Sequence, residues 1–412
     1  MILQKFFRGL IFFFLRIFTK FKLWRIKPQI IGITGSYAKT STREALALIL
    51  ASKFKIKKNQ ESFNTEYGIC LDLLNIDNTG KICGKHSIRA WLKILIKGFI
   101  NALFSKEKYD KLILEIGIDK PKDIDLILKV IKPNIQIITG ITLNHVEFGF
   151  ESEADIWNEK KKLLYALNQN GTAVLNADDK YVSTAIKDLK CKIINFGENN
   201  KNADLQAKLL SNTVDGLEIE FEHQGKKAIG KFAILGSHHS TVLLAAISGA
   251  LALNFSLEEA IKILENFQLP EHRMTKIEGI NKCIMLDSTY NASPKTLTAA
   301  LDLLLSLSAN RKLAVLGCMN ELGDFSKRKH IQVGKCAADS ADLLIAVGDE
   351  ADFYIQGWKE KCEKQYFSFA DSQMAAQFLK DFVKEGDLLL IKGSRGIEME
   401  RIVATLNVKH EA

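Results

Sequence analysis

Residues 29–42 read Gln-Ile-Ile-Gly-Ile-Thr-Gly-Ser-Tyr-Ala-Lys-Thr-Ser-Thr, and this stretch indicates the class of fold. Gln29–Ile33 is a short, mostly apolar run that predicts a buried strand, and a helical pattern follows from Arg43 to Phe54. The residues between them form a tight loop that contains a Lys-Thr pair. Strand, loop and helix in this order bind phosphate, because backbone N–H groups and a helix N-terminus converge on the anion.

The phosphate-loop hypothesis assigns roles to the residues of this loop. Lys39 would meet the β- and γ-phosphates of ATP, and Thr40 would hold Mg²⁺. The residue before the lysine is usually glycine, whereas here it is Ala38, whose methyl group is tolerated only with a negative φ or with strain. Taken alone, the loop leaves open the alternative of a chance Lys-Thr pair at a helix start. The predicted ATP contacts are Gly35, Ser36, Ala38, Lys39, Thr40 and Ser41.

Two further strands bring candidate metal ligands to one edge of a sheet. Lys111–Ile116 is an apolar strand with Glu115 near its end, where a carboxylate beside a phosphate loop suits Mg²⁺. A third strand, Ile135–Thr139, ends shortly before His145. Each residue also has an ordinary interpretation, which is a solvated strand end for Glu115 and a structural histidine for His145.

Strands and helical patterns alternate along the chain, from the first strand to the late strand and loop of Gly386–Arg395. This alternation predicts an α/β fold with a mostly parallel, doubly wound sheet. We expect a central phosphate-loop ATPase domain over residues 29–269 and a C-terminal Rossmann-like α/β domain over residues 270–412, preceded by a separate segment, 1–28. A chain of 412 residues is long enough for two such cores.

The net charge of +9 is concentrated at the N-terminus. Residues 1–28 contain no acidic side chain but carry Lys5, Arg8, Arg16, Lys20, Lys22, Arg25 and Lys27. We expect no nucleic-acid partner, because a nucleic-acid-binding protein would carry basic residues on its folded body too. The 7 cysteines are scattered and never form C-x-x-C, which favours reduced thiols in a cytoplasm over disulfides or a zinc site. We expect a monomer.

The first 28 residues predict a helix that lies on a membrane rather than through it. Their longest uncharged run between basic residues is Gly9–Leu15, well short of the roughly 20 apolar residues that a spanning helix needs. Most of the basic side chains fall on one side of a helix, and Lys22 and Arg25 break the pattern. An interfacial helix on an anionic membrane fits this pattern. A signal peptide and a helix packed on the protein's own body are the alternatives.

A second basic stretch, Ile88–Phe104, has apolar residues at helical spacing. It contains three basic residues and no acidic one. An ordinary helix buried on the sheet is one interpretation. Two weak anchors together can hold a protein on anionic lipid, so the competing hypothesis is a cytoplasmic protein placed at the inner face of the membrane.

The order of several motifs resembles the Mur ligase family from about Gln29 to the end of the chain. The similar segments are Thr34–Thr40 (TGSYAKT), Asn64–Gly68 (NTEYG), Glu115–Gly117 (EIG), Asn176–Asp179 (NADD), Gly236–Ala246, Arg273–Met274, Asp287–Pro294 (DSTYNASP), Leu316–Gly323 (LGCMNELG) and Lys392–Arg395 (KGSR). The octapeptides at 287 and 316 and the final KGSR resemble the branch of the family that adds D-alanyl-D-alanine. Where the family usually has two asparagines, this chain has His239 and Val242.

The resemblance implies the remaining site residues. The family's metal-binding histidine matches His145, and its lysine, which is carbamylated in several members, matches Lys160; on the residues alone, Glu159–Lys162 is equally a solvated charged face. The implied catalytic residues are Lys39, Glu115, His145 and Lys160, and the implied metal ligands are Thr40, Glu115, His145 and Lys160. Further nucleotide contacts are His238, Arg273, Asp287, Tyr290 and Asn291, and substrate contacts are Asn64, Thr65, Lys392, Ser394 and Arg395.

The resemblance also implies an activity, which is ATP-dependent amide-bond formation in peptidoglycan synthesis through an acyl phosphate. ATP and Mg²⁺ would be the cofactors, and a muramoyl-tripeptide and D-alanyl-D-alanine the substrates. Domain closure would bring Asp287, Tyr290 and Asn291 over the nucleotide and exclude water. This branch normally begins with a domain that grips the UDP end of its substrate, and we expect that domain to be missing here. The alternatives are a ligase of the same fold for another substrate and a non-catalytic, membrane-associated relative.

Overall fold

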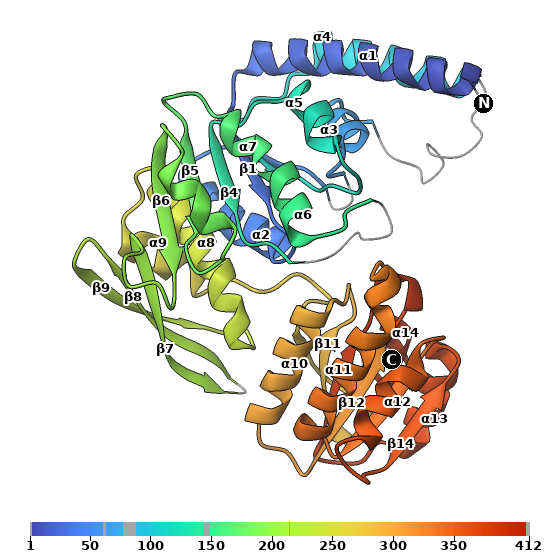
Figure 1. The fold of residues 1–412 in the computed structure, drawn as a ribbon. Coiled ribbons are helices and arrows are strands. Elements are labelled where there is room, and N and C mark those ends of the chain that lie inside the picture. Colours follow the sequence, from blue (N-terminus) through green and yellow to red (C-terminus); the bar gives the residue numbers. More distant parts are fainter. Residues whose placement is uncertain (1, 61–62, 77–87, 143–148, 214, 409–412) are drawn as a thin grey trace.

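The computed structural model of the chain describes residues 2–60, 63–76, 88–142, 149–213 and 215–408, with the backbone alone for residues 2–8 and 88–90. It contains two sheets, each with its own helices, and the N-terminal helix lies at the end of the molecule opposite the C-terminal lobe (Figure 1). This arrangement confirms the predicted α/β fold class.

The first sheet has nine strands and carries the phosphate loop. In spatial order its strands are β2 (Ile56–Lys58), β3 (Lys111–Glu115), β1 (Gln29–Thr34), β4 (Ile135–Ile138), β5 (Thr172–Asn176), β6 (Lys192–Gly197), β7 (Leu205–Thr213), β8 (Gly216–His223) and β9 (Lys226–Phe232). Neighbours are parallel from β2 to β7, whereas β7, β8 and β9 are antiparallel. The strand β1 lies between β3 and β4 and is parallel to both, so residues that follow β1 lie near the carboxyl ends of these two strands.

Helices cover both faces of this sheet, because alternate residues of its buried strands point to opposite sides. Ile31 and Ile33 pack with one set of helices, whereas Ile30 packs with the other. The first set is α2 (Lys39–Ala51), α8 (Ser240–Leu251) and α9 (Leu257–Leu264). The second set is α1 (Ile2–Ile26), α3 (Glu66–Leu73), α4 (Ile88–Phe104), α5 (Asp123–Leu128), α6 (Glu153–Lys160) and α7 (Lys162–Tyr165).

The second sheet has six strands and forms the C-terminal lobe. In spatial order its strands are β10 (Thr275–Glu278), β11 (Ile284–Ser288), β15 (Asp387–Lys392), β12 (Arg311–Gly317), β13 (Leu343–Val347) and β14 (Tyr366–Phe369). Its helices are α10 (Pro294–Ser306), α11 (Ser326–Ser340), α12 (Ala351–Lys359), α13 (Ser372–Phe382) and α14 (Glu400–Leu406). Only β10 pairs antiparallel, and buried clusters lie on both faces of the sheet.

Most predicted elements are present, with shifted ends. The helix after the phosphate loop was expected from Arg43 to Phe54, but α2 begins at Lys39 and ends at Ala51. Its first turn is Lys-Thr-Ser-Thr, which lacks the apolar repeat that marks a helix in a sequence. The helix α1 ends before Lys27, which has a φ of 55°, and Pro28, which cannot continue a helix.

Candidate active site

The phosphate loop joins the end of β1 to the start of α2. Gly35 has a φ of 151°, and a Cβ at this position would lie 2.0 Å from Oγ1 of Thr139. The backbone N–H of Ser36 donates to the carbonyl of Gly140 over 2.8 Å, and the Ser36 hydroxyl donates to the carbonyl of Thr142. The loop is therefore held against the segment that follows β4, and a glycine is required at position 35, where the two segments approach most closely.

Ala38 occupies a left-handed backbone conformation. Its φ is 61° and its ψ is −1°, directly before the first residue of α2. Of the two possibilities that the sequence left for this position, a negative φ or a strained backbone, the structure has the strained one. This conformation costs an L-residue about 1–2 kcal/mol. The strained residue turns the chain so that Lys39 and Thr40 lie in the first turn of the helix, and Ser41 is buried behind them.

A carboxylate lies beside this first turn, as the sequence predicted. The Thr40 hydroxyl donates to Oε2 of Glu115 over 2.8 Å, and the Arg43 guanidinium lies 3.5 Å from the same oxygen. Asn59 bonds both the backbone N–H and the carbonyl of Glu115. Glu115 is buried, so the alternative of a solvated strand end is wrong. Asn59 and Arg43 were not predicted, because no motif marks them and their contact with Glu115 depends on the order of the strands.

Lys160 is buried at the same edge of the sheet. Its Nζ lies 3.5 Å from the Thr34 hydroxyl, at the carboxyl end of β1, and its side chain is almost completely enclosed. Burial, and then the charge of Lys39, hold the pKa of Lys160 well below its ordinary value. The interpretation of Glu159–Lys162 as a solvated face is therefore wrong for Lys160, and Glu159 is buried as well.

The donors around Thr40 suit a hard cation. A threonine hydroxyl and a carboxylate in contact are the kind of oxygen ligands that Mg²⁺ takes beside a nucleotide phosphate. An ammonium at Lys160 would not coordinate a cation, whereas a carbamylated Lys160 would offer two more oxygens. The fourth predicted ligand, His145, lies outside the described residues.

The C-terminal lobe brings a second group of cations towards the loop. The Arg273 guanidinium lies 3.8 Å from the centre of the Tyr290 ring, and that of Arg395 lies 5.4 Å from the same ring. Lys392 is buried and donates to the carbonyl of Asn291 over 2.7 Å and to the Ser288 hydroxyl over 3.1 Å. Burial, and then the charge of Arg273, lower the pKa of Lys392 to about 7.

The two lobes meet at this cluster. Desolvation lowers the pKa of Lys39, the charge of Glu115 in the first lobe raises it, and the charge of Arg273 from the second lobe lowers it. Tyr37, in the phosphate loop, accepts a hydrogen bond of 3.1 Å from Lys295 at the start of α10, and the Lys295 ammonium also lies 4.3 Å from the Tyr37 ring centre. Neither Tyr37 nor Lys295 was predicted as a site residue, because a contact between two lobes leaves no local signal in the sequence.

His238 and His239 also face this junction. Their rings lie 4.1 Å apart, and His239 donates from Nδ1 to the carbonyl of Leu235 over 2.7 Å. Burial lowers the pKa of His239 to about 4 and that of His238 well below its ordinary value, and the charge of Lys392 acts on both in the same direction. Both rings are therefore held neutral.

Several predicted contact residues make local bonds. The Asp287 carboxylate bonds His272 over 2.8 Å and Thr289, and the Thr65 side chain caps α3 by accepting from the N–H of Gly68. The Ser394 hydroxyl accepts from the N–H of Asn320 over 2.9 Å. These side chains shape the loops on which they stand.

Asn64 lies close to the strand-end motif. Its carbonyl accepts from the N–H of Gly117, and a Cβ on Gly117 would come within 2.7 Å of the Asn64 amide. Asn64 thus lies beside Gly117, which is two residues beyond Glu115 at the carboxyl end of β3. The hydroxyl of its neighbour Thr65 is occupied by the cap of α3.

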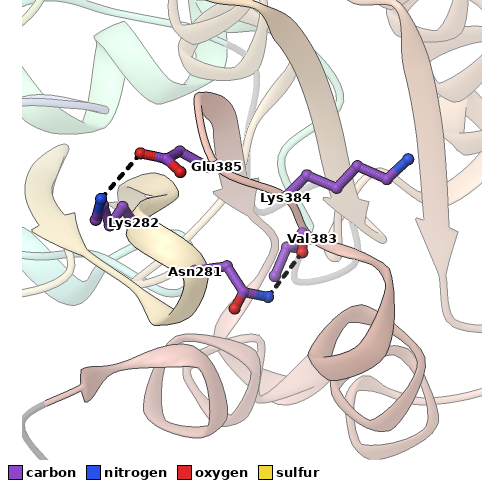
Figure 2. A pocket seen from close by; sticks show the side chains of 5 residues that line it. All are labelled: Asn281, Lys282, Val383, Lys384 and Glu385. Carbon is purple, nitrogen blue, oxygen red and sulfur yellow. Dashed lines mark hydrogen bonds and ion pairs between the residues drawn. The ribbon is translucent and has the colours of Figure 1, made fainter.

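A surface hollow lies elsewhere, on the C-terminal lobe. It has a volume of about 380 Å³ and is lined by Asn281, Lys282, Val383, Lys384 and Glu385 (Figure 2). Lys282 and Glu385 form an ion pair of 3.0 Å across it, and the Asn281 amide donates to the carbonyl of Val383. It contains none of the predicted site residues and takes no part in the candidate active site.

Family models match both lobes in sequence order. The model described as "Mur ligase middle domain" matches residues 95–250, and the model described as "Mur ligase, glutamate ligase domain" matches residues 272–395. The chain belongs to the Mur ligase family. The motifs from Glu115–Gly117 to Lys392–Arg395 lie within the two matched ranges, whereas Thr34–Thr40 and Asn64–Gly68 precede the first of them.

Individual Mur ligases are similar over nearly the whole chain. A UDP-N-acetylmuramoyl-tripeptide–D-alanyl-D-alanine ligase of Bacillus subtilis is 26% identical over 387 residues, which are 93% of this chain and 77% of that protein. A structure of MurF from Acinetobacter baumannii has a TM-score of 0.79 at 23% identity and covers 95% of this chain and 79% of that one. The MurF ligase from Thermotoga maritima in complex with ADP has a TM-score of 0.78 at 24% identity, covering 96% and 83%.

Proposed function

We propose that this chain is an ATP-dependent, ADP-forming ligase that joins D-alanyl-D-alanine to a muramoyl-tripeptide in peptidoglycan precursor synthesis. The observation that carries the proposal is the convergence of Lys39, Thr40, Glu115 and Lys160 at one edge of the sheet, opposite the cations of a second lobe. The names of the similar enzymes supply the substrates. The proposed domains are 29–269 and 270–412, with residues 1–28 as a separate segment.

The chemistry requires an activated carboxylate. A substrate carboxylate oxygen attacks the γ-phosphorus of ATP, and the bond between that phosphorus and the β–γ bridging oxygen breaks to give an acyl phosphate and ADP. The amine of the second substrate then attacks the acyl carbon, and the tetrahedral intermediate expels inorganic phosphate as the amine loses a proton. Excluding water matters because an acyl phosphate also hydrolyses.

The residues of the first lobe suit the phosphoryl transfer. Lys39 and the loop N–H groups would bind the β- and γ-phosphates at the N-terminus of α2 and stabilise the charge that spreads over the transferred group. Mg²⁺, held by Thr40 and Glu115 and completed by His145 and a carbamylated Lys160, would neutralise phosphate charge when bound. Asn59 and Arg43 would keep the Glu115 carboxylate in place.

The residues of the second lobe suit the nucleotide and the incoming amine. The Tyr290 ring, which lies close to the guanidinium groups of Arg273 and Arg395, would form part of the nucleotide contact with Asn291 and His238. Lys392, Ser394 and Arg395 would contact the substrate, whereas Asp287 would act by holding the loop through His272 and Thr289.

The decisive experiment measures ADP formation with UDP-muramoyl-tripeptide and D-alanyl-D-alanine, each omitted in turn. The proposal predicts ADP and amide product only when both are present, and no turnover in Lys39→Ala, whose fold is checked by circular dichroism. Lys53→Ala, which changes an exposed lysine just beyond α2, is the matched control. Wild-type rates in Lys39→Ala would contradict the assignment of the phosphate loop.

Two alternatives give different results in the same assay. A ligase of this fold for another substrate would form ADP with other carboxylate and amine pairs but not with these. A non-catalytic relative would bind nucleotide without ADP formation in every combination; the strained Ala38 and the replacement at Val242 are the features that favour it.

A further inference from the structure

The helices α1 and α4 lie side by side at the end of the molecule away from the C-terminal lobe (Figure 1). The Phe18 and Phe99 rings meet between them with centroids 5.6 Å apart. Among the described residues, no helix is both long and apolar enough to cross a membrane. Both helices carry exposed side chains, so the pair lies on the surface of the first lobe.

One face of α1 fastens this helix to the lobe. Ile11, Phe12 and Leu15 are buried in the same core as α3 and β3. Lys22, although charged, is completely buried, where it pairs with Glu107 over 2.6 Å and donates to the carbonyl of Leu73 over 2.8 Å. The Arg25 guanidinium donates to the carbonyls of Ala102, Leu103 and Ser105 at the end of α4. The two basic residues that broke the sequence pattern are therefore the ones that hold the helix in place.

The opposite face of the pair is apolar and exposed. The solvent-exposed fraction of Trp24 is 67% and that of Phe104 is 71%, although both side chains are large and apolar. We name this face the α1–α4 platform. Its exposed apolar side chains are Leu10, Phe13, Phe14, Ile17, Phe21 and Trp24 on α1, with Leu92, Ile96, Phe99, Ile100 and Phe104 on α4. Contiguous exposed apolar surface on this scale marks an interaction site.

Positive charge lies along both outer margins of the platform. Helical spacing puts Arg16 and Lys20 on the side of α1 away from Phe18, and Lys93 and Lys97 on the side of α4 away from Phe99. Neither helix contains an acidic residue. A second copy of this chain packed face to face would bring these like charges together without a counter-charge, whereas anionic lipid headgroups would neutralise them.

From this charge and burial pattern we infer that the α1–α4 platform lies on an anionic lipid bilayer, with its aromatic and aliphatic side chains at the level of the acyl boundary and its lysines and arginines among the headgroups. The inference concerns where the protein resides and does not depend on its reaction. Lys22 and Arg25 keep α1 from rolling over to hide its apolar face, so the platform is present before lipid is met.

The test is flotation of the full-length protein with vesicles of phosphatidylcholine and phosphatidylglycerol, and with vesicles of phosphatidylcholine alone. Removing residues 1–26 would uncover the core of the first lobe, so surface substitutions are the better probe. The apolar variant changes Phe13, Trp24 and Phe104 to Ser. Its matched control changes Ile229, Leu305 and Met374, exposed side chains away from the platform, to Ser. The charge variant changes Arg16, Lys20, Lys93 and Lys97 to Gln.

We expect the wild type and the matched control to float with anionic vesicles at low salt, and the apolar variant to lose at least tenfold in partitioning. Each neutralised charge should cost about fivefold. Absence of wild-type binding, or equal binding by the apolar variant, would overturn the inference. A dimer in light scattering that the apolar variant abolishes, without vesicle binding, would instead assign the platform to a second copy. Ligase activity is not a readout here, so failure of the proposed function would leave this test unaffected.

Discussion

Ala38 is a single residue whose methyl group strains the phosphate loop. Replacing it with glycine removes the left-handed strain of about 1–2 kcal/mol but loses about 0.4–1 kcal/mol through the more flexible unfolded chain. We therefore expect Ala38→Gly to be more stable by about 0–1.6 kcal/mol and to keep or improve its nucleotide affinity. Thermal unfolding and nucleotide titration measure the two effects.

The control is Ala51→Gly at the exposed end of the same helix, where glycine should destabilise by up to about 1 kcal/mol. A large loss of nucleotide affinity in Ala38→Gly would show that the loop adopts another conformation when it binds.

Lys160 is a buried amine whose pKa is lowered by burial and by the charge of Lys39. A lower pKa favours the neutral amine, which is the form that adds to CO₂ with loss of a proton to give a carbamate. We predict that Lys160 is carbamylated in the active enzyme. Lys160→Ala should lose activity by several orders of magnitude, and short carboxylic acids in the buffer should restore part of it. Lys161→Ala, one residue further along and partly exposed, should keep nearly full activity. Full activity of Lys160→Ala would refute a catalytic carbamate.

At the scale of elements, α1 depends on a buried charge. Lys22→Ala leaves the carbonyl of Leu73 unpaired and removes the nearest partner of Glu107, which Lys57 still contacts over 3.3 Å. We expect the free energy of unfolding to fall by about 1–3 kcal/mol. Urea denaturation measures the loss, and Lys20→Ala, on the exposed side of the same helix, should change stability by less than about 0.5 kcal/mol. Equal stability of the two variants would mean that the Lys22 ion pair does not hold the helix.

The sequence predicted elements well where one physical signal dominated. The bounds of α4 match the predicted Ile88–Phe104, because the apolar repeat is uninterrupted, and β1 and β3 match within one residue. The antiparallel strands β7 to β9 were not anticipated by the alternation of strands and helices. The first turn of α2 was missed because its residues, Lys-Thr-Ser-Thr, lack the apolar repeat that marks a helix in a sequence.

The candidate site could be predicted only in part, for a related reason. Lys39, Thr40, Glu115 and Lys160 stand in motifs, and the structure brings all four together. Asn59 completes the same site because β2 lies beside β3, and Thr34 does so because β1 lies between β3 and β4. No pattern of residues predicts which strands are neighbours, because the order of the strands is determined by the packing of the whole sheet.

At the scale of the molecule, the junction of the two lobes is sensitive to acid. His238 and His239 are neutral in the folded protein, and the pKa of His239 is about 4 against an ordinary value of 6.5. Between these values the unfolded chain binds more protons than the folded one, so stability is lost as the pH falls from 6.5 towards 4.

We predict that His239→Asn reduces this acid loss, since asparagine does not titrate. The measurement is the melting temperature of both proteins at pH values from neutral down to about 4.5, and the difference between them should grow in favour of the variant as the pH falls. His223→Asn, which changes a partly exposed histidine of β8, is the control. A constant difference across the range would show that His239 titrates normally.

The position of the α1–α4 platform determines which lobe would lie at the membrane. It lies on the first lobe, at the end opposite the C-terminal lobe (Figure 1). On a bilayer, the ATPase lobe would be held at the membrane surface and the C-terminal lobe would extend into water, where domain closure would meet no resistance from lipid. The bound protein would then diffuse along the membrane surface, while its substrates diffuse freely in the surrounding water. A soluble substrate would then reach the junction of the lobes from the aqueous side, and the product would leave by the same side.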